Sequence, residues 1–222
     1  MNRRRRAMNL GNNEIGKSIR DAIDLQQDLD SLAVLIKKVY AALQHSIIFA
    51  ELVEVARGFT PSDERPNFCE ILMEDETCRL SLVGIHRFAP IPVHDHPGTA
   101  GALLAVHGRV QVRSYSIEEF VRKPSLVRLR CLSEEVLATG SVATVDRGAN
   151  NLHGLQAMHL NSVCLAIHTP PPTGNQRAWY FPTNPLAIHN QHATWNRIVK
   201  PSQKIESTQN CLPLCNPAGA VA

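Results

Sequence analysis

The stretch PIPVHDHPGTAGALLAVHGRVQVRSY, from Pro90 to Tyr115, places two histidines on either side of one aspartate, ahead of an apolar, strand-like run. In a strand, residues two apart point to the same side, so His94 and His96 can aim both imidazoles at one point. Asp95 then turns outward or makes a hydrogen bond that supports its neighbours. Neutral imidazole is the commonest metal ligand, so the pattern favours half of a metal site inside a β-barrel.

A third ligand has to come from elsewhere in the chain. The segment GANNLHGLQAM offers His153, which follows a glycine-containing turn in a strand-rich region. Three histidines leave coordination positions open, which suits a catalytic metal better than a structural one. A His-x-His pair also arises by chance, and a lone histidine is more often a core or surface residue, so spacing alone leaves both interpretations open.

The N-terminal part of the chain has a helical pattern. Apolar residues recur every three or four positions over 14–44, which predicts a helix. A second helix is expected over 47–57, with Ser46 as its N-cap and Gly58 just past its end.

Beyond Phe68 the pattern changes to short, β-branched and partly alternating segments, which Gly, Pro and Asn separate. This pattern predicts an all-β core, either a barrel or a sandwich. After Pro182 the chain is polar, with one apolar patch around Trp195. The expected divisions are a disordered basic start, helices packed on the barrel, the β domain and a flexible tail, at 1–13, 14–60, 61–200 and 201–222.

Composition excludes several classes of function. A net charge of +3 over 222 residues is too small to indicate nucleic-acid binding, and no apolar run is long enough to span a membrane. The basic N-terminus lacks the apolar segment of a secretory signal, and its acidic neighbours argue against a transit peptide. Six cysteines without a C-x-x-C pair then indicate reduced thiols in a cytoplasmic protein, expected to be a monomer. A metal-binding role for Cys211 and Cys215 is a weak hypothesis.

Several linked motifs resemble one family. The sequence IPVHDHPG, a glycine before a strand that ends in SY, NNLHGLQA, a double proline and RAWYF occur in order between Phe68 and Phe181. This combination is similar to the cupin-fold thiol dioxygenases of the plant cysteine oxidase and cysteamine dioxygenase family. The resemblance implies a double-stranded β-helix (jelly-roll) barrel. It also implies one Fe(II) ion held by His94, His96 and His153.

The chemistry of that family then becomes an expectation for this chain. Both atoms of O2 would be added to the sulfur of a thiol to give a sulfinic acid. A free thiol has a pKa near 8.5 and loses its proton on binding such an ion. The expected partners are O2 and either cysteamine, another small thiol or the N-terminal cysteine of a peptide.

The substrate side of the site departs from the family pattern. Free-cysteine dioxygenases use an upstream arginine to bind the substrate carboxylate, whereas the corresponding stretch NFCEILMED has Glu70 and no arginine. That absence favours an aminothiol or a peptide N-terminus. Gly101 stands where mammalian-type cysteine dioxygenases have a cysteine. Ala166 and Pro172 replace an aspartate and a tyrosine of the plant enzymes, which puts an N-terminal-cysteine substrate in doubt.

The remaining candidates for substrate binding are His168, Tyr180, Arg177 and Glu70. His168 lies two residues after Ala166, so in a strand it faces the same side and can supply a polar contact or a proton acceptor. It can equally be a core histidine. Tyr180 and Arg177 are expected at the rim, although an ordinary surface arginine is an equal alternative.

Two other functions remain open. One is a non-catalytic cupin that binds a metal or ligand, since the substrate residues at Ala166 and Pro172 differ from the family. The other is a cupin enzyme with another divalent metal and another reaction, because ligand affinity alone does not select iron.

Overall fold

The computed structural model describes residues 16–17, 19–21, 28–62, 64–122, 125–148, 151–172, 177–183 and 194–199. The predicted disordered start and flexible tail, together with Cys211 and Cys215, lie outside these residues. The cysteines within them are free thiols, namely Cys69, Cys78, Cys131 and Cys164.

Helices α2 (Leu29–Leu43) and α3 (Ile47–Arg57) precede the strands, after a short helical stretch described at 16–17 and 19–21. The single helix predicted over 14–44 is wrong at Asp28. Asp28 has an extended backbone, and its carboxylate accepts a hydrogen bond of 2.7 Å from the Ser31 N–H, so a new helix begins at Leu29. Helix α3 is capped as the sequence predicted, by Ser46 at its start and Gly58 at its end.

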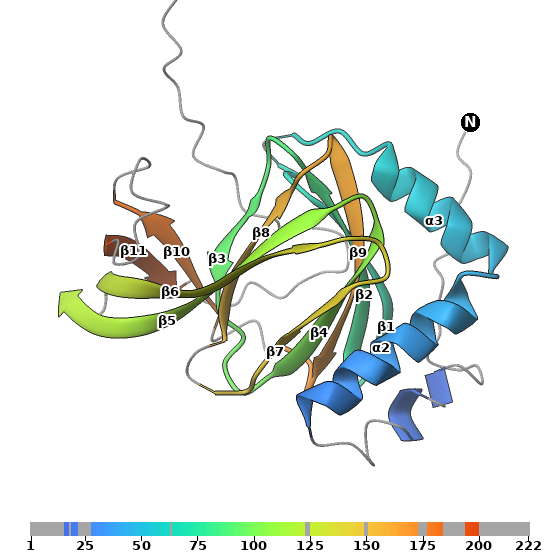
Figure 1. Cartoon of the computed structure of the whole chain (residues 1–222), viewed down its shortest axis with the longest axis horizontal. Helices are drawn as coiled ribbons and strands as arrows, with labels where there is room; N and C mark the ends of the chain where they lie inside the picture. Colours follow the sequence, from blue (N-terminus) through green and yellow to red (C-terminus); the bar gives the residue numbers. More distant parts are fainter. Residues whose placement is uncertain are drawn as a thin grey trace, which may run out of the picture.

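Eleven strands follow among the described residues, and all their pairings are antiparallel. Their bounds are β1 Phe68–Glu74, β2 Arg79–His86, β3 Ile91–His94, β4 Ala100–His107, β5 Val110–Arg122, β6 Leu126–Leu137, β7 Val142–Val145, β8 Leu152–Ala157, β9 Asn161–Thr169, β10 Ala178–Pro182 and β11 Thr194–Val199. One sheet has the order β1-β2-β9-β4-β7, and the other closes into a barrel in the order β10-β11-β6-β5-β8-β3. This is an all-β core that contains a closed barrel and carries an N-terminal helical extension, as the sequence predicted (Figure 1).

The two helices cover the outer face of the five-stranded sheet (Figure 1). Buried leucines and isoleucines of α2, such as Ile36 and Leu43, share one apolar cluster with Leu80, Leu104 and Leu165 of the sheet. Within the described residues, no single helix is long and apolar enough to cross a membrane; α2 and α3 meet such a test only jointly, across a bend of 105°. The apolar side of these two helices is therefore part of the protein core.

A second apolar cluster lies between the two sheets. It joins Ile85, Ala105 and Cys164 of the five-stranded sheet to Val112 and Leu155 of the other. Its members alternate along the strands with residues of the helix-facing cluster, as expected for a sheet covered on both faces. This filled space closes one end of the interior and leaves the other end to polar side chains.

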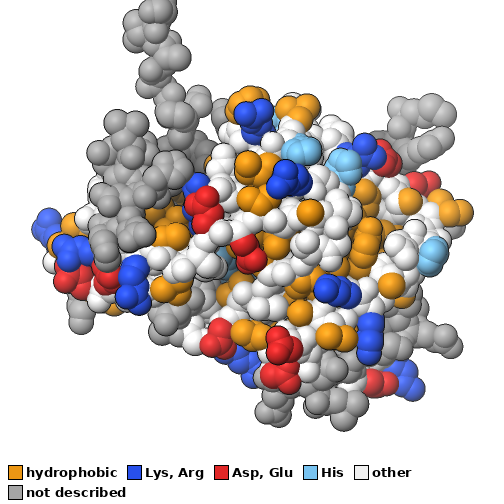
Figure 2. Space-filling model, viewed as in Figure 1, with side chains coloured by type: hydrophobic (Ala, Val, Ile, Leu, Met, Phe, Trp, Pro, Cys, Tyr) orange, Lys and Arg blue, Asp and Glu red, His pale blue; other side chains and the backbone are white. Residues whose placement is uncertain are grey.

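A third cluster fills the closed six-stranded barrel. Tyr115, Tyr180 and Trp195 are buried there, and the rings of Tyr115 and Trp195 meet edge to face at 5.5 Å. The apolar patch around Trp195 is therefore part of strand β11. The polar residues around it gave no strand pattern in the sequence. On the outer face of the β5–β6 hairpin, acidic and basic side chains lie side by side (Figure 2), including the Arg128–Glu119 pair at 3.0 Å.

Candidate metal centre

Three histidines converge between the two sheets. His94 ends β3 and pairs across the ladder with His153 on β8, so their rings lie 4.5 Å apart between centroids. The His96 ring lies 4.7 Å from that of His94 and 5.2 Å from that of His153. One ring nitrogen from each residue lies within 4.8 Å of the others, and all three side chains are buried. The structure thus brings together the triad that the sequence predicted.

Backbone carbonyls orient two of these rings. His94 Nδ1 lies 2.8 Å from the Pro92 oxygen, and His153 Nδ1 lies 3.3 Å from the Asn151 oxygen. Because a carbonyl only accepts, each Nδ1 carries the proton and each Nε2 keeps its lone pair. Burial lowers the pKa of His153 to about 4, so the ring is neutral at pH 7. Neutral imidazoles with fixed tautomers are a donor set that fits a divalent transition metal.

His96 is placed by a side-chain clamp rather than by a strand. Strand β3 ends at His94, so the expectation that both histidines lie on one strand is wrong. The chain turns away because Pro97 has no N–H for the ladder and Gly98 adopts a φ of 73°. Asn151 then holds His96 from both sides: its Nδ2 donates to the His96 oxygen at 2.5 Å, and its Oδ1 accepts from the His96 N–H at 3.4 Å.

Asp95, between two ligands of the triad, points away from them. It accepts hydrogen bonds from the Ala178 N–H at 2.6 Å and from the Tyr180 hydroxyl at 3.0 Å. The Tyr180 hydroxyl accepts in turn from Arg197 Nε at 3.3 Å. Tyr180 pairs with Val93 and packs in the third apolar cluster. The expectation that Tyr180 lies at the rim of the site is therefore wrong. Tyr180 positions the backbone of the ligand loop by way of Asp95.

A fourth imidazole, His168, faces the triad from β9 of the opposite sheet. Its ring centroid lies 4.6 Å from that of His96. The edge of the ring that carries Cδ2 and Nε2 lies against Gly101, where an added Cβ would come within 3.1 Å of Cδ2. His168 Nδ1, on the other edge, is buried and has no partner within the described residues. Gly101 therefore leaves the space that the His168 ring fills.

Arg177 reaches the triad from the start of β10. Its Nη2 lies 2.8 Å from His96 Nδ1, and its guanidinium lies 5.6 Å from the centre of the Trp179 ring. A narrow hollow beside it is lined by Asp95, His96, Pro97, Pro172 and Arg177. The guanidinium is therefore a component of the site and not an ordinary surface group.

For two other residues, Ala166 and Glu70, the face of the strand shows whether the side chain lies on the side of the triad. Ala166 faces the interior together with His168, because the two are alternate residues of β9. Glu70 shares its face of β1 with Phe68, which packs in the helix-facing cluster. The structure therefore corrects the expectation that Glu70 serves the substrate, since its face lies away from the triad.

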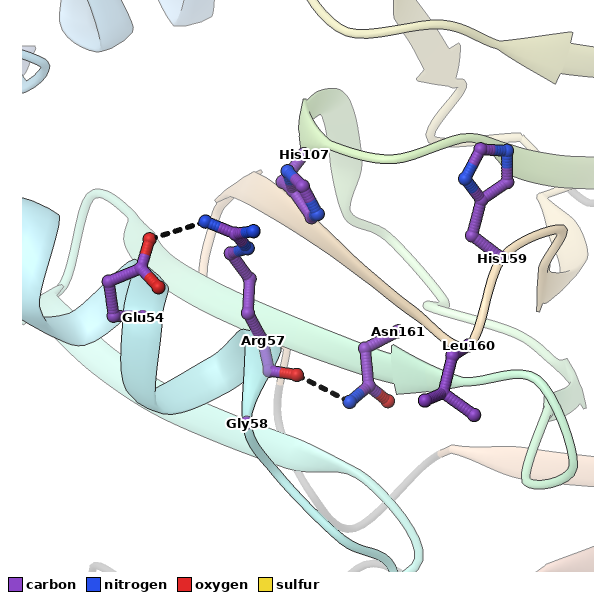
Figure 3. Close-up of a pocket in the computed structure, with 7 residues that line it drawn as sticks. All are labelled: Glu54, Arg57, Gly58, His107, His159, Leu160 and Asn161. Carbon is purple, nitrogen blue, oxygen red and sulfur yellow. Dashed lines mark hydrogen bonds and ion pairs between the residues drawn. The ribbon is translucent and has the colours of Figure 1, made fainter.

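Two further histidines lie in a surface hollow. His107 and His159 line it together with Arg57, which is paired with Glu54 at 2.5 Å, and with Asn161 (Figure 3). The two rings are separate from the triad, and no group of three ligand residues forms there within the described part of the chain.

Comparison with known proteins gives one family match. The family model PCO_ADO, for plant cysteine oxidases and cysteamine dioxygenases, matches residues 52–214. A search of curated proteins finds no match.

Solved structures with a similar arrangement share little sequence. TT1209 from Thermus thermophilus is 22% identical with a TM-score of 0.36, over 48% of this chain and 85% of that one. The cupin domain of Schizosaccharomyces pombe Cnp3 is 12% identical with a TM-score of 0.39, over 51% of this chain and 70% of that one. A Klebsiella pneumoniae protein with a double-stranded β-helix domain is 15% identical with a TM-score of 0.39, over 52% and 81%.

Proposed function

Because the chain belongs to the PCO_ADO family, we propose that it is an Fe(II)-dependent thiol dioxygenase. The reaction is R–SH + O2 → R–SO2H, in which sulfur loses four electrons and O2 gains four, so no other reductant is required. The substrate classes that we propose are cysteamine, another small thiol or the N-terminal cysteine of a peptide. The observation that carries the proposal is the buried triad of His94, His96 and His153.

The triad supports this chemistry through its charge and geometry. Three neutral imidazoles leave a bound Fe(II) ion with its full positive charge, which favours a thiolate over a thiol and leaves positions open for substrate and O2. The carbonyls behind His94 and His153 keep both Nε2 lone pairs directed inward.

The direct test is oxygen uptake by the iron-loaded protein with cysteamine, free cysteine and a short peptide that begins with cysteine. We expect uptake with at least one thiol and a product that is heavier by two oxygen atoms in mass spectrometry. Protein loaded with Zn(II), which is redox-inactive, is the matched control and should consume no oxygen. No uptake with any thiol, despite bound iron, contradicts the proposal.

A non-catalytic cupin is the second candidate, and one observation favours it. Ala166 and Pro172 place no polar group at two positions beside the triad. A binding module would hold the metal and bind a ligand without consuming oxygen. Iron content together with absent oxygen uptake would favour it over the dioxygenase.

A further inference from the structure

The end of the protein opposite the triad carries an exposed surface that the proposed function does not use. Strand β9 runs from Asn161 at this end to His168 beside the triad, a rise of about 23 Å. Three turns meet at this end, over 86–91, 107–110 and 157–161. At this upper end of the view in Figure 2, hydrophobic side chains gather beside those of Lys or Arg and His.

Large apolar side chains project from two of these turns. Phe88 is 77% exposed, Leu160 63% and Met158 44%. Backbone hydrogen bonds hold the turns together, because the Arg87 N–H donates to the Leu160 oxygen and the Met158 N–H to the Arg109 oxygen, each at 2.9 Å. An ordered backbone therefore presents these apolar groups to solvent. Exposed apolar clusters with polar surroundings are typical of interaction sites.

Two exposed arginines lie on the same turns as these apolar groups. Arg87 and Arg109 form no ion pair within the described residues. The guanidinium of Arg87 lies 5.9 Å from the centre of the Phe88 ring, so a positive charge and an aromatic face are presented together. A ligand that carries both an anionic and an apolar group matches this arrangement.

The hollow of Figure 3 adjoins these turns and adds recessed basic groups. It has a volume of about 430 Å³, and Leu160 belongs to its lining as well as to the exposed apolar group. Arg57, His107 and His159 line it too, and Glu54, the one carboxylate among its described lining residues, is paired with Arg57. A guanidinium has five N–H donors, so Arg57 keeps donors for a second carboxylate beside Glu54.

Shape and charge favour a peptide over other occupants of this surface. A second copy of the chain, docked about a two-fold axis, would bring the same surface of both copies together, so Arg87 and Arg109 would meet like charges. A flat membrane would not reach the half-buried His107 inside the hollow. An extended peptide can place an apolar side chain against Phe88 and carboxylates both at the rim and within the hollow.

We propose that this docking surface, formed by Arg87, Phe88, Arg109, Met158 and Leu160 together with the hollow, binds an acidic peptide segment of a partner protein. An apolar side chain of the segment packs against Phe88 and Leu160, and flanking carboxylates pair with Arg87 and Arg109. The triad lies at the other end of the protein, so docking requires neither iron nor turnover.

The direct test is selection from a phage-displayed library of random peptides, with the iron-loaded full chain as the bait. We expect the selected peptides to combine Asp or Glu with a large apolar residue. A fluorescein-labelled synthetic copy of a selected peptide then gives affinities by fluorescence anisotropy. The metal-free protein should bind this peptide with the same affinity.

Variants of the exposed residues locate the binding. Phe88→Ser should weaken the peptide by about 30-fold, because aromatic anchors dominate interfaces of this kind. Arg87→Gln and Arg109→Gln should each weaken it by about 5-fold, and that loss should shrink as salt is raised. Ile47→Ser, at a residue that is also 77% exposed, and Arg130→Gln on the β5–β6 hairpin are the matched controls and should change nothing.

Separate measurements exclude loss of fold and other occupants. Phe88→Ser should keep its circular dichroism and iron content, because the side chain is exposed. No selected peptide, or binding that does not depend on Phe88 and Arg87, overturns the inference. Phe88-dependent binding to phosphatidylserine vesicles in place of peptide, or a dimer in sedimentation that Phe88→Ser abolishes, overturns it as well. None of these measurements uses oxygen uptake, so the docking surface and the dioxygenase are tested independently.

Discussion

Two groups of histidines in the described part of the chain differ in their burial and in the groups that surround them. At the polar end of the interior, His94, His96 and His153 are buried, and two of them are fixed by backbone carbonyls. In the hollow of Figure 3, His107 is half-buried and His159 is exposed, beside an arginine that is paired with glutamate. An imidazole becomes a metal ligand through the groups that orient it and remove water, and only the first place has them.

Removal of one ligand should break this contrast most strongly. His153→Ala leaves two imidazoles, so we expect iron affinity to fall by more than about 100-fold, a larger loss than that for removing an orienting group. The barrel should stay folded, because the other side of β8 still packs. Metal analysis and circular dichroism measure both effects. His107→Ala is the matched control, and full iron content in His153→Ala would show that the ligand set is wrong.

The second largest difference between the two groups of histidines is expected when the pH is lowered. The folded-state pKa of His153 is about 4, because burial outweighs its bond to Asn151, whereas the ordinary value is 6.5. The unfolded chain therefore binds the proton first, so this stabilisation is complete above pH 6.5 and is lost as the pH falls towards 4. Its contribution is about 1.4 kcal/mol per pH unit within that window.

Urea unfolding of the metal-free protein from pH 7 to pH 4 measures this effect. The slope should decrease in His153→Gln and persist in His159→Gln, whose ring is exposed. An unchanged slope in His153→Gln would mean that His153 is not buried in its neutral form.

The clamp on His96 can be tested with two matched asparagines. Asn151→Ala leaves the buried N–H of His96 without its partner and removes one of the two donors to the His96 carbonyl, which still accepts from the Thr99 N–H at 3.0 Å. We therefore expect a loss of about 10- to 100-fold in iron affinity. Asn161→Ala removes hydrogen bonds to the backbone of Arg57 and Phe59 at the surface hollow. It should leave iron binding unchanged. Equal affinities in the two variants would show that the clamp does not position His96.

The smallest effect is expected at Gly101. In Gly101→Ala the new Cβ would lie 3.1 Å from His168 Cδ2 and 3.2 Å from the Ile167 oxygen, so the ring or the strand has to move. We expect a loss of about 1–3 kcal/mol in the free energy of unfolding, measured with urea. Gly148→Ala, whose nearest neighbour would lie at 3.4 Å, should cost less. Equal stability of the two would show that Gly101 does not make room for His168.

Local patterns were enough for much of the fold. The period of the apolar residues identified α3 and the strand-rich core. Each of these elements buries one face, so its apolar residues recur at the period of a helix or a strand. The same reasoning joined two helices into one, because Asp28 does not interrupt the apolar spacing. It missed β11, since its buried Trp195 stands among polar residues that face solvent.

For the candidate site too, some features could be predicted from local sequence and others depend on the fold. The sequence by itself predicted the three histidines of the triad, because His94 and His96 lie in one short motif and the resemblance to the family adds His153. Only the tertiary structure decided that Glu70 faces the helices, that Tyr180 serves Asp95, and that Arg177 reaches His96. The physical reason is that spacing along a strand fixes which residues share a face. Which faces meet depends on how the two sheets pack.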